Sequence, residues 1–300
     1  MGKIVRSIST DGGILCMAID STDMAAQAER YHKSSATMTA AMGRLLTAAS
    51  MMGDMLKGED NSITLRLAGN GPAGPMIAVA DYSGNVKVYA HNPQADLPTN
   101  QYGKLDVSGA VGKEGSLTVI KDLGMKEPYV GQTPIVSGEI AEDITHYYAV
   151  SEQTPTVCAL GVLVDTDLSV ISACGYLVQL LPGVDDATID KLEANINKLP
   201  PVSKMLADGM TPEKICMMAL EGFSPEVLDT SDVSYKCDCS RERVERALAS
   251  LSPEDLREMA ADKDTQVECH FCDKKYRFSS KELLDMAKRR ESQKEEDEEE

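Results

Sequence analysis

Four cysteines near the C-terminal end of the chain have the spacing of a metal site. One residue separates Cys237 from Cys239, two separate Cys269 from Cys272, and 29 residues lie between the two pairs. Each pair can supply two thiolates from one backbone turn, and a fold between them can bring all four sulfurs together. Four thiolates leave no open position for water, so the pattern predicts one structural or switching zinc ion rather than a hydrolytic metal.

The four cysteines permit other interpretations. An iron–sulfur cluster also accepts four cysteines, but we rank it behind zinc. His270 lies inside the second pair and is not counted as a ligand, because four cysteines already complete a tetrahedral site. The C-x-C spacing is tighter than that of common zinc fingers. Neighbouring thiols at this spacing could pair with each other once a metal leaves.

The residues around the two pairs predict a small folded module. Ser240 and Ser252 are candidate N-caps of two short helices, and residues 266–269 and 276–278 could flank the second pair as a hairpin. A module of this size is too small for a full core. Metal binding would therefore supply its folding free energy, on the order of 10 kcal/mol.

The remaining chemistry-bearing residues do not form a catalytic pattern. The other cysteines occur singly, at Cys16, Cys158, Cys174 and Cys216. Cys16 and Cys158 adjoin apolar runs, which is typical of buried, unreactive thiols. Glu152 and the histidines outside the cysteine pairs fit no hydrolase motif. We therefore expect that the protein is not an enzyme.

The elements that must position the cysteine module begin with a mixed α/β body. Apolar runs and period-two alternation predict strands at residues 13–19, 63–67, 76–80, 86–90, 117–120, 159–164 and 168–181. A long helix is expected from Ser34 or Ser35 to Gly58, buried on a sheet, because it carries few charges. Gly43 and Gly53 would allow this helix to pack closely.

After the body, the pattern changes to short helices interrupted by proline. Ile189, Leu192 and Ile196 recur at helical spacing, and Thr211 with Pro212 forms an N-cap followed by proline at the first helical position. This segment has little apolar material for a core of its own. It must pack on another part of the protein or be marginally stable.

The charge of the chain excludes several classes of partner. The net charge is −18, of which residues 291–300 contribute seven acidic side chains and one lysine, so we expect a disordered acidic tail. An acidic chain repels phosphate backbones, which argues against general nucleic-acid binding. The N-terminus lacks an apolar targeting region, and the longest uncharged stretch, 168–184, is too interrupted to span a membrane. We expect a cytoplasmic protein with reduced thiols.

The combination of features resembles a known family. C-x-C followed about thirty residues later by C-x-x-C, near the end of an acidic chain of this length, is similar to the bacterial thirty-three-kilodalton heat-shock protein, a redox-regulated holdase chaperone. Further matching stretches are Tyr147-Tyr148 with residues 151–156, residues 56–58 and residues 175–183. The resemblance covers nearly the whole chain up to Arg290.

The resemblance implies a chaperone that needs no ATP and stays inactive while the four cysteines hold zinc. Oxidation would form the disulfides Cys237–Cys239 and Cys269–Cys272, release zinc, unfold the linker and expose apolar surface to unfolded client proteins. A homodimer is implied for the oxidised form. The candidate client surface consists of Met205, Met210, Met217 and Met218.

The expected fold is α+β, with four parts. These are a chaperone core domain (1–181), a metastable helical linker (182–230), a zinc-binding redox-switch domain (231–290) and the acidic tail (291–300).

Two other functions remain as alternatives. The first is a thiol-disulfide oxidoreductase that uses the pair Cys269 and Cys272, although a second cysteine pair and the lack of a thioredoxin-like βαβ context argue against it. The second is a zinc-ribbon nucleic-acid module. Basic residues of the C-terminal region could form its patch, but acidic residues interleave with them.

Overall fold

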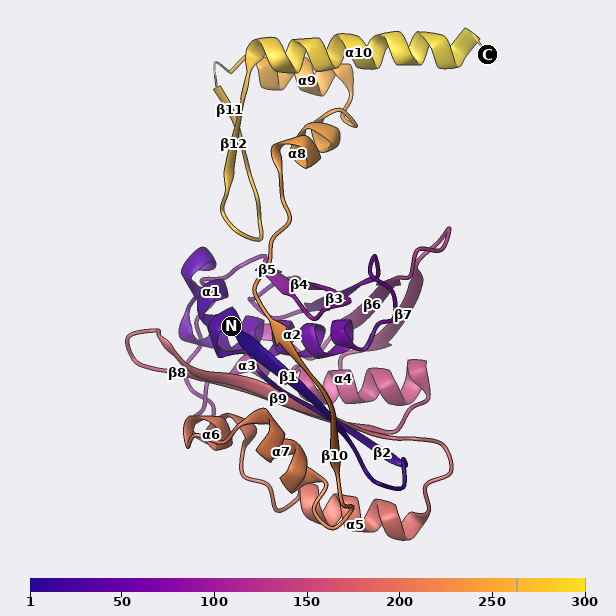
Figure 1. The fold of residues 1–300 in the computed structure, drawn as a ribbon. Coiled ribbons are helices and arrows are strands. Elements are labelled where there is room, and N and C mark those ends of the chain that lie inside the picture. The colour runs from indigo at the N-terminus through magenta and orange to yellow at the C-terminus, as the bar shows by residue number, and fades with distance from the viewer. Residues whose placement is uncertain (263, 300) are drawn as a thin grey trace. The chain divides into compact units, whose positions relative to one another are not determined.

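The computed structural model describes residues 1–262 and 264–299, with side chains described as far as Glu291. The chain divides into two compact units, Met1–Lys236 and Cys237–Glu300. Both units contain helices and strands (Figure 1). The α+β class predicted from the sequence is confirmed.

The first unit contains two five-stranded antiparallel sheets. The first sheet has the order β10-β1-β2-β9-β8, made of β1 (Gly2–Ile8), β2 (Ile14–Asp20), β8 (Thr156–Val164), β9 (Val170–Leu180) and β10 (Glu226–Val233). The second has the order β5-β4-β3-β6-β7, made of β3 (Ser62–Gly69), β4 (Met76–Asp81), β5 (Val86–Ala90), β6 (Gly115–Asp122) and β7 (Tyr129–Pro134). The hairpin expected around residues 81–85 is confirmed as β4–β5.

Helices cover and separate the two sheets of this unit. They are α1 (Thr22–His32), α2 (Ala36–Asp54), α3 (Val107–Val111), α4 (Ala141–Tyr147), the π-helix η1 (Tyr148–Glu152), α5 (Asp186–Ile196), α6 (Val202–Ala207) and α7 (Pro212–Ala219). Helix α2 is the long helix that the sequence predicts. Its N-cap is Ser35, whose hydroxyl accepts a hydrogen bond from the Met38 amide at 3.1 Å.

Helix α2 lies between the two sheets rather than on one of them (Figure 1). Its apolar side chains share one core with residues of both sheets, which explains why the helix is buried on nearly every side. A Cβ added at Gly43 would lie 2.9 Å from a methyl of Val162 in β8. A Cβ at Gly53 would lie 2.6 Å from the carbonyl oxygen of Asp81 in β4. The two glycines therefore permit close approach to different sheets.

This packing predicts the effect of replacing Gly53 by alanine. Alanine is intrinsically better in a helix by about 1 kcal/mol, but its methyl group would collide with backbone of β4 that cannot move independently. We expect Gly53→Ala to lower the free energy of unfolding by roughly 1–2 kcal/mol, measured by urea denaturation. Gly43→Ala should cost less, because it meets the end of a side chain. Unchanged stability of Gly53→Ala would contradict the close packing.

The outer face of the first sheet carries a second core, formed with the linker helices α5, α6 and α7. Alternate residues of β2 and β9, including Cys16 and Val178, pack there against linker residues, including Leu192 and Ile215. The expectation that the linker segment packs on another part of the protein is confirmed. Because both faces of the sheet are buried, β9 reads as an almost continuous apolar run.

Strand β10 was not expected from the sequence, which indicated a helical linker as far as residue 230. It adds to the edge of the first sheet by pairing with β1, from Gly2 opposite Val233 to Ile8 opposite Glu226. Most of its side chains are exposed, including Leu228 at 56%. A strand with one short apolar stretch and many acids has no period-two signal of its own, so its pairing comes from β1.

The second unit is built from two short helices, a hairpin and a final helix. They are α8 (Arg241–Leu248), α9 (Pro253–Ala260), β11 (Asp264–Glu268), β12 (Lys275–Ser279) and α10 (Ser280–Glu299). Ser240 and Ser252 cap α8 and α9 as predicted, and the hairpin is confirmed. A small core includes the fully buried side chains of Leu256, Phe278 and Leu283.

Helix α10 was not expected, since the sequence indicated no element after Phe278 other than the acidic tail. Helix α10, Ser280–Glu299, extends into residues 291–300. Except for Glu291, the side chains of that tail lie outside the described residues. The disordered tail therefore stays a prediction.

Candidate metal centre

The two cysteine pairs of the second unit converge on one point. The Sγ atoms of Cys237, Cys239, Cys269 and Cys272 all lie within 4.8 Å of one another. Across the pairs, Cys237 Sγ is 3.6 Å from Cys269 Sγ, and Cys239 Sγ is 3.3 Å from Cys272 Sγ. Among the four, Cys272 is buried and the others are half-buried. This group could hold a metal ion.

Local backbone structure places each pair. Cys237 and Cys239 immediately precede Ser240, the N-cap of α8, so the start of this helix fixes the first pair. The second pair occupies the turn between β11 and β12, where the Cys269 amide donates to the Lys274 carbonyl at 2.9 Å. Asp273 adopts the left-handed conformation with φ of 54°, and its amide donates to the Cys269 carbonyl at 2.9 Å. The tight turn directs both thiols of this pair inward.

The four thiols have different electrostatic surroundings. Burial by itself would raise the pKa of Cys239, but hydrogen bonds from the Tyr276 hydroxyl and from the other cysteines lower this pKa to about 7. Tyr276 Oη lies 3.1 Å from Cys239 Sγ. Burial raises the pKa of Cys237 above its ordinary value. One thiol of the group is therefore readily ionised, which favours metal binding.

The other cysteines have the surroundings of unreactive thiols. Cys16, Cys174 and Cys216 are buried, and Cys158 is half-buried. Burial raises the pKa of Cys174 to about 12. A hydrogen bond with Cys216, together with burial, raises the pKa of Cys16. Cys16 and Cys174 therefore ionise little at neutral pH, in contrast to Cys239.

Comparison with known proteins identifies the family. The model of the Hsp33 protein family matches residues 2–279. The chain belongs to the Hsp33 family. The 33 kDa chaperonin of Acetivibrio thermocellus is 48% identical over 292 residues, covering 97% of this chain and 98% of the relative. That of Ruminiclostridium cellulolyticum is 45% identical over 286 residues, covering 95% and 97%.

A solved structure of the Hsp33 family agrees with the fold. The crystal structure of the 33 kDa chaperonin from Thermotoga maritima matches with a TM-score of 0.88 and 35% identity, covering 95% of this chain and 97% of that one. The resemblance stated from the cysteine spacing is thereby confirmed at the level of the family. Hsp33 proteins are chaperones, and chaperones bind client proteins.

The methionines suggested as a client surface lie in the linker segment of this Hsp33 chain. Met205 is 1% exposed and belongs to the core between the linker helices and the first sheet. Met210, Met217 and Met218 are half-buried. The described conformation thus covers much of this apolar surface.

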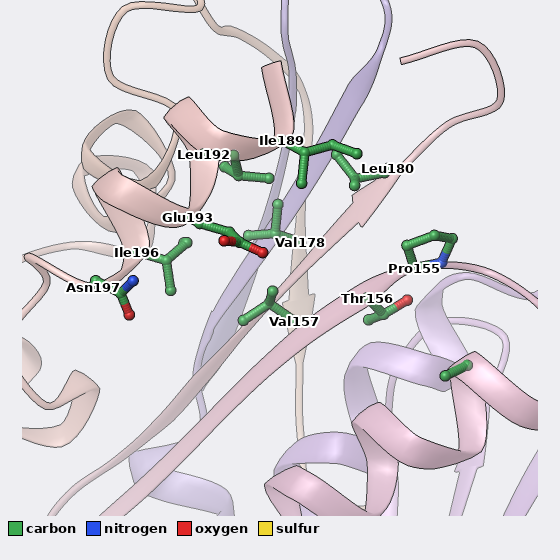
Figure 2. A pocket seen from close by; sticks show the side chains of 11 residues that line it. Pro155, Thr156, Val157, Val178, Leu180, Ile189, Leu192, Glu193, Ile196 and Asn197 are labelled. Carbon is green, nitrogen blue, oxygen red and sulfur yellow. The ribbon is translucent and has the colours of Figure 1, made fainter. Parts of the chain in front are cut away.

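Helix α5 and strands β8 and β9 line an apolar pocket of about 530 Å³ that opens to solvent (Figure 2). Ile189, Leu192 and Ile196 of the helix face Val157 and Val178 of the strands across this space. Val157, Ile189 and Ile196 are only half-buried. The packing of α5 on the sheet is therefore incomplete.

Sequence reasoning found the four cysteines but missed Tyr276 as a contact of the centre. Tyr276 was assigned only to a strand of the hairpin, and no spacing rule links its hydroxyl to a cysteine 37 residues earlier.

Helices long and apolar enough to cross a membrane are not found among the described residues.

Proposed function

We propose that this protein is an ATP-independent holdase, switched on by oxidation of Cys237, Cys239, Cys269 and Cys272. In this proposal the reduced form holds one zinc ion and is inactive. The observation that carries the proposal is the convergence of the four thiols in a module with a small core, directly after a linker whose packing is incomplete. The protein acts by binding unfolded clients and has no catalytic turnover.

The thiol geometry fits zinc. Zinc–sulfur bonds of about 2.3 Å in a tetrahedron place the sulfurs about 3.8 Å apart. The two sulfur–sulfur distances across the pairs, 3.6 and 3.3 Å, are close to this value. Zinc bound here would be held by four thiolates and would supply folding free energy to the module rather than an open site for chemistry.

Oxidation removes the ligands in two equivalent steps. In each step one thiolate attacks hydrogen peroxide, the O–O bond breaks, and a sulfenic acid and hydroxide form. A second thiolate then attacks the sulfenic sulfur and displaces hydroxide, which leaves a disulfide. We propose the pairs Cys237–Cys239 and Cys269–Cys272, from the resemblance to the family. A disulfide lacks the thiolate charge that holds zinc, so the module loses its metal and its stability.

The chain itself can couple the module to the linker. Cys237 directly follows Lys236, whose backbone amide donates a hydrogen bond to the Val86 carbonyl at 2.9 Å. The backbone amide of Ser234 donates a hydrogen bond to the side-chain oxygen of Asn85 at 3.1 Å. These contacts continue directly into β10. We propose that unfolding of the module frees this stretch, that β10 and helices α5 to α7 then leave the first sheet, and that residues 182–230 act as the metastable linker.

The client surface is then the apolar face that the linker covers, together with the linker's own methionines at 205, 210, 217 and 218. Apolar surface of this kind binds unfolded segments without sequence preference. We also propose a cytoplasmic location, a homodimer in the oxidised form, and no binding of membranes or nucleic acid.

The decisive experiment measures zinc, thiols and client binding on the same sample. Before oxidation we expect one zinc per chain and no suppression of the aggregation of a thermally unfolding client. Hydrogen peroxide with mild heat should remove four thiols and one zinc together and switch suppression on. Equal suppression before and after oxidation would refute the redox switch.

The two alternatives give different results in simple assays. A thiol-disulfide oxidoreductase would turn over a disulfide substrate with a thiol donor. A zinc-ribbon nucleic-acid module would bind RNA or DNA with strong salt dependence. Against the second, Arg241 pairs with Glu245 and Glu282, at 3.0 and 2.6 Å, so part of the basic charge of the module is neutralised locally.

A further inference from the structure

We propose that Tyr276 sets the oxidation rate of the cysteine centre by donating a hydrogen bond to the sulfur of Cys239. The inference rests on the proposed function and deepens it, since it names a side chain that regulates the switch. Tyr276 Oη lies 3.1 Å from Cys239 Sγ, which is short for a hydrogen bond to sulfur. The hydroxyl therefore acts on a ligand atom without being a ligand.

The direction of this hydrogen bond follows from the chemistry of the two groups. A thiolate, whether free or bound to a metal, has no proton and can only accept. The tyrosine hydroxyl must then be the donor. Hydrogen bonds to ionised acceptors are stronger than those between neutral groups, so this one withdraws appreciable electron density from the sulfur.

The fold holds the tyrosine ring in position independently of the cysteine. Tyr276 is the second residue of β12 and pairs with Val267 of β11. Its half-buried ring packs against the small core of the module. Because the ring has its own packing, removal of the hydroxyl alone should leave the hairpin intact.

Two further contacts to the sulfurs of the group come from the backbone. The backbone amide of Cys239 donates to Cys237, and that of Lys274 donates to Cys272. These donors belong to the main chain, so they remain when the side chain of the donor residue is replaced. The Tyr276 contact comes from a side chain, so evolution or mutation can alter it without altering the fold. It is therefore a suitable place to adjust the sensitivity of the centre.

The affected step is the first attack on the oxidant. A lone pair of the Cys239 thiolate attacks one oxygen of hydrogen peroxide, the O–O bond breaks, hydroxide leaves, and Cys239 becomes a sulfenic acid. Another thiolate of the group then attacks this sulfur, forms the S–S bond and displaces a second hydroxide. Electron density engaged by the Tyr276 hydroxyl is less available for the first attack, so the hydrogen bond slows it.

The test is Tyr276→Phe in the full-length zinc-loaded protein. We expect zinc release by hydrogen peroxide to be roughly fivefold to tenfold faster than in the wild type, and zinc affinity to be about tenfold weaker, as for other residues that contact metal ligands. Tyr148→Phe is the matched control. It removes a hydroxyl that donates to the sulfur of Met55 at 3.7 Å in the first unit, and both zinc properties should stay unchanged.

Cobalt substitution separates this role from a purely structural one. Loss of the hydrogen bond should move the sulfur-to-cobalt charge-transfer band of Tyr276→Phe to lower energy, while its far-UV circular dichroism matches the wild type. Unchanged release rates with an unchanged band, or slower release, would overturn the inference. If the wild type itself releases no zinc on oxidation, the proposed switch fails, whereas the band shift and zinc affinity still decide whether Tyr276 bonds to the ligand.

Discussion

Replacement of Ile215 by alanine is expected to make the reduced, zinc-loaded protein suppress client aggregation without any oxidant. Ile215 lies on α7, is fully buried, and belongs to the core between the linker helices and the first sheet. Truncation of a buried isoleucine costs about 2–4 kcal/mol. Because the cost falls on the packing of the linker, it shifts the balance between docked and undocked linker by about a hundredfold.

The measurement combines light scattering of a thermally unfolding client with zinc analysis and limited proteolysis. Suppression should appear while zinc remains at one per chain and while the linker becomes sensitive to protease. Lys214→Ala, at an exposed position of the same helix, should stay inactive. Ile63→Ala removes the same atoms from the core around α2 and should lower global stability without activating the protein. A protease-sensitive but inactive Ile215→Ala would show that the linker does not mask the client surface.

Replacement of Cys269 by serine should abolish zinc binding at physiological zinc concentrations. The variant loses one of four thiolates, and a serine hydroxyl is not ionised at neutral pH, so we expect affinity to fall on the order of a thousandfold. Since the module has only a small core, its helices α8 and α9 should lose structure when the metal is lost. Competition with a chromophoric chelator measures the affinity, and far-UV circular dichroism measures the helix content.

The matched control for this prediction is Cys158→Ser. Cys158 is a half-buried thiol of β8 in the first unit, so its replacement should leave one zinc per chain. Peroxide should still activate Cys158→Ser but should produce no further change in Cys269→Ser. Retention of zinc by Cys269→Ser at wild-type affinity would exclude the four-thiolate site.

The features that could be predicted from the sequence are those encoded over short distances. Ser240 and Ser252 cap their helices because a serine hydroxyl satisfies an amide only three residues away. The hairpin β4–β5 and strand β3 follow from alternation within a few residues. The paired cysteines indicated a metal site, because each pair can supply two ligands from a single turn.

Residue pairs that are distant in the chain have no such local signature. The β1–β10 pairing joins Gly2 to Val233, and neither strand shows a strong pattern alone. Helix α2 lies between two sheets rather than on one because the second sheet packs against the side of α2 that the first sheet leaves uncovered. In the same way, the covering of one sheet face by α5, α6 and α7 depends on complementary apolar surfaces, which the sequence of the linker does not identify.

The cysteine centre shows the same division at the scale of atoms. Residue types and spacing alone determined which four side chains could bind a metal. Only the tertiary structure decided that their sulfurs lie within 4.8 Å of one another and that the hydroxyl of Tyr276 reaches Cys239. Ligand identity is a property of each short motif, whereas the contact with Tyr276 arises when the hairpin folds against the first cysteine pair and brings residues 37 positions apart together.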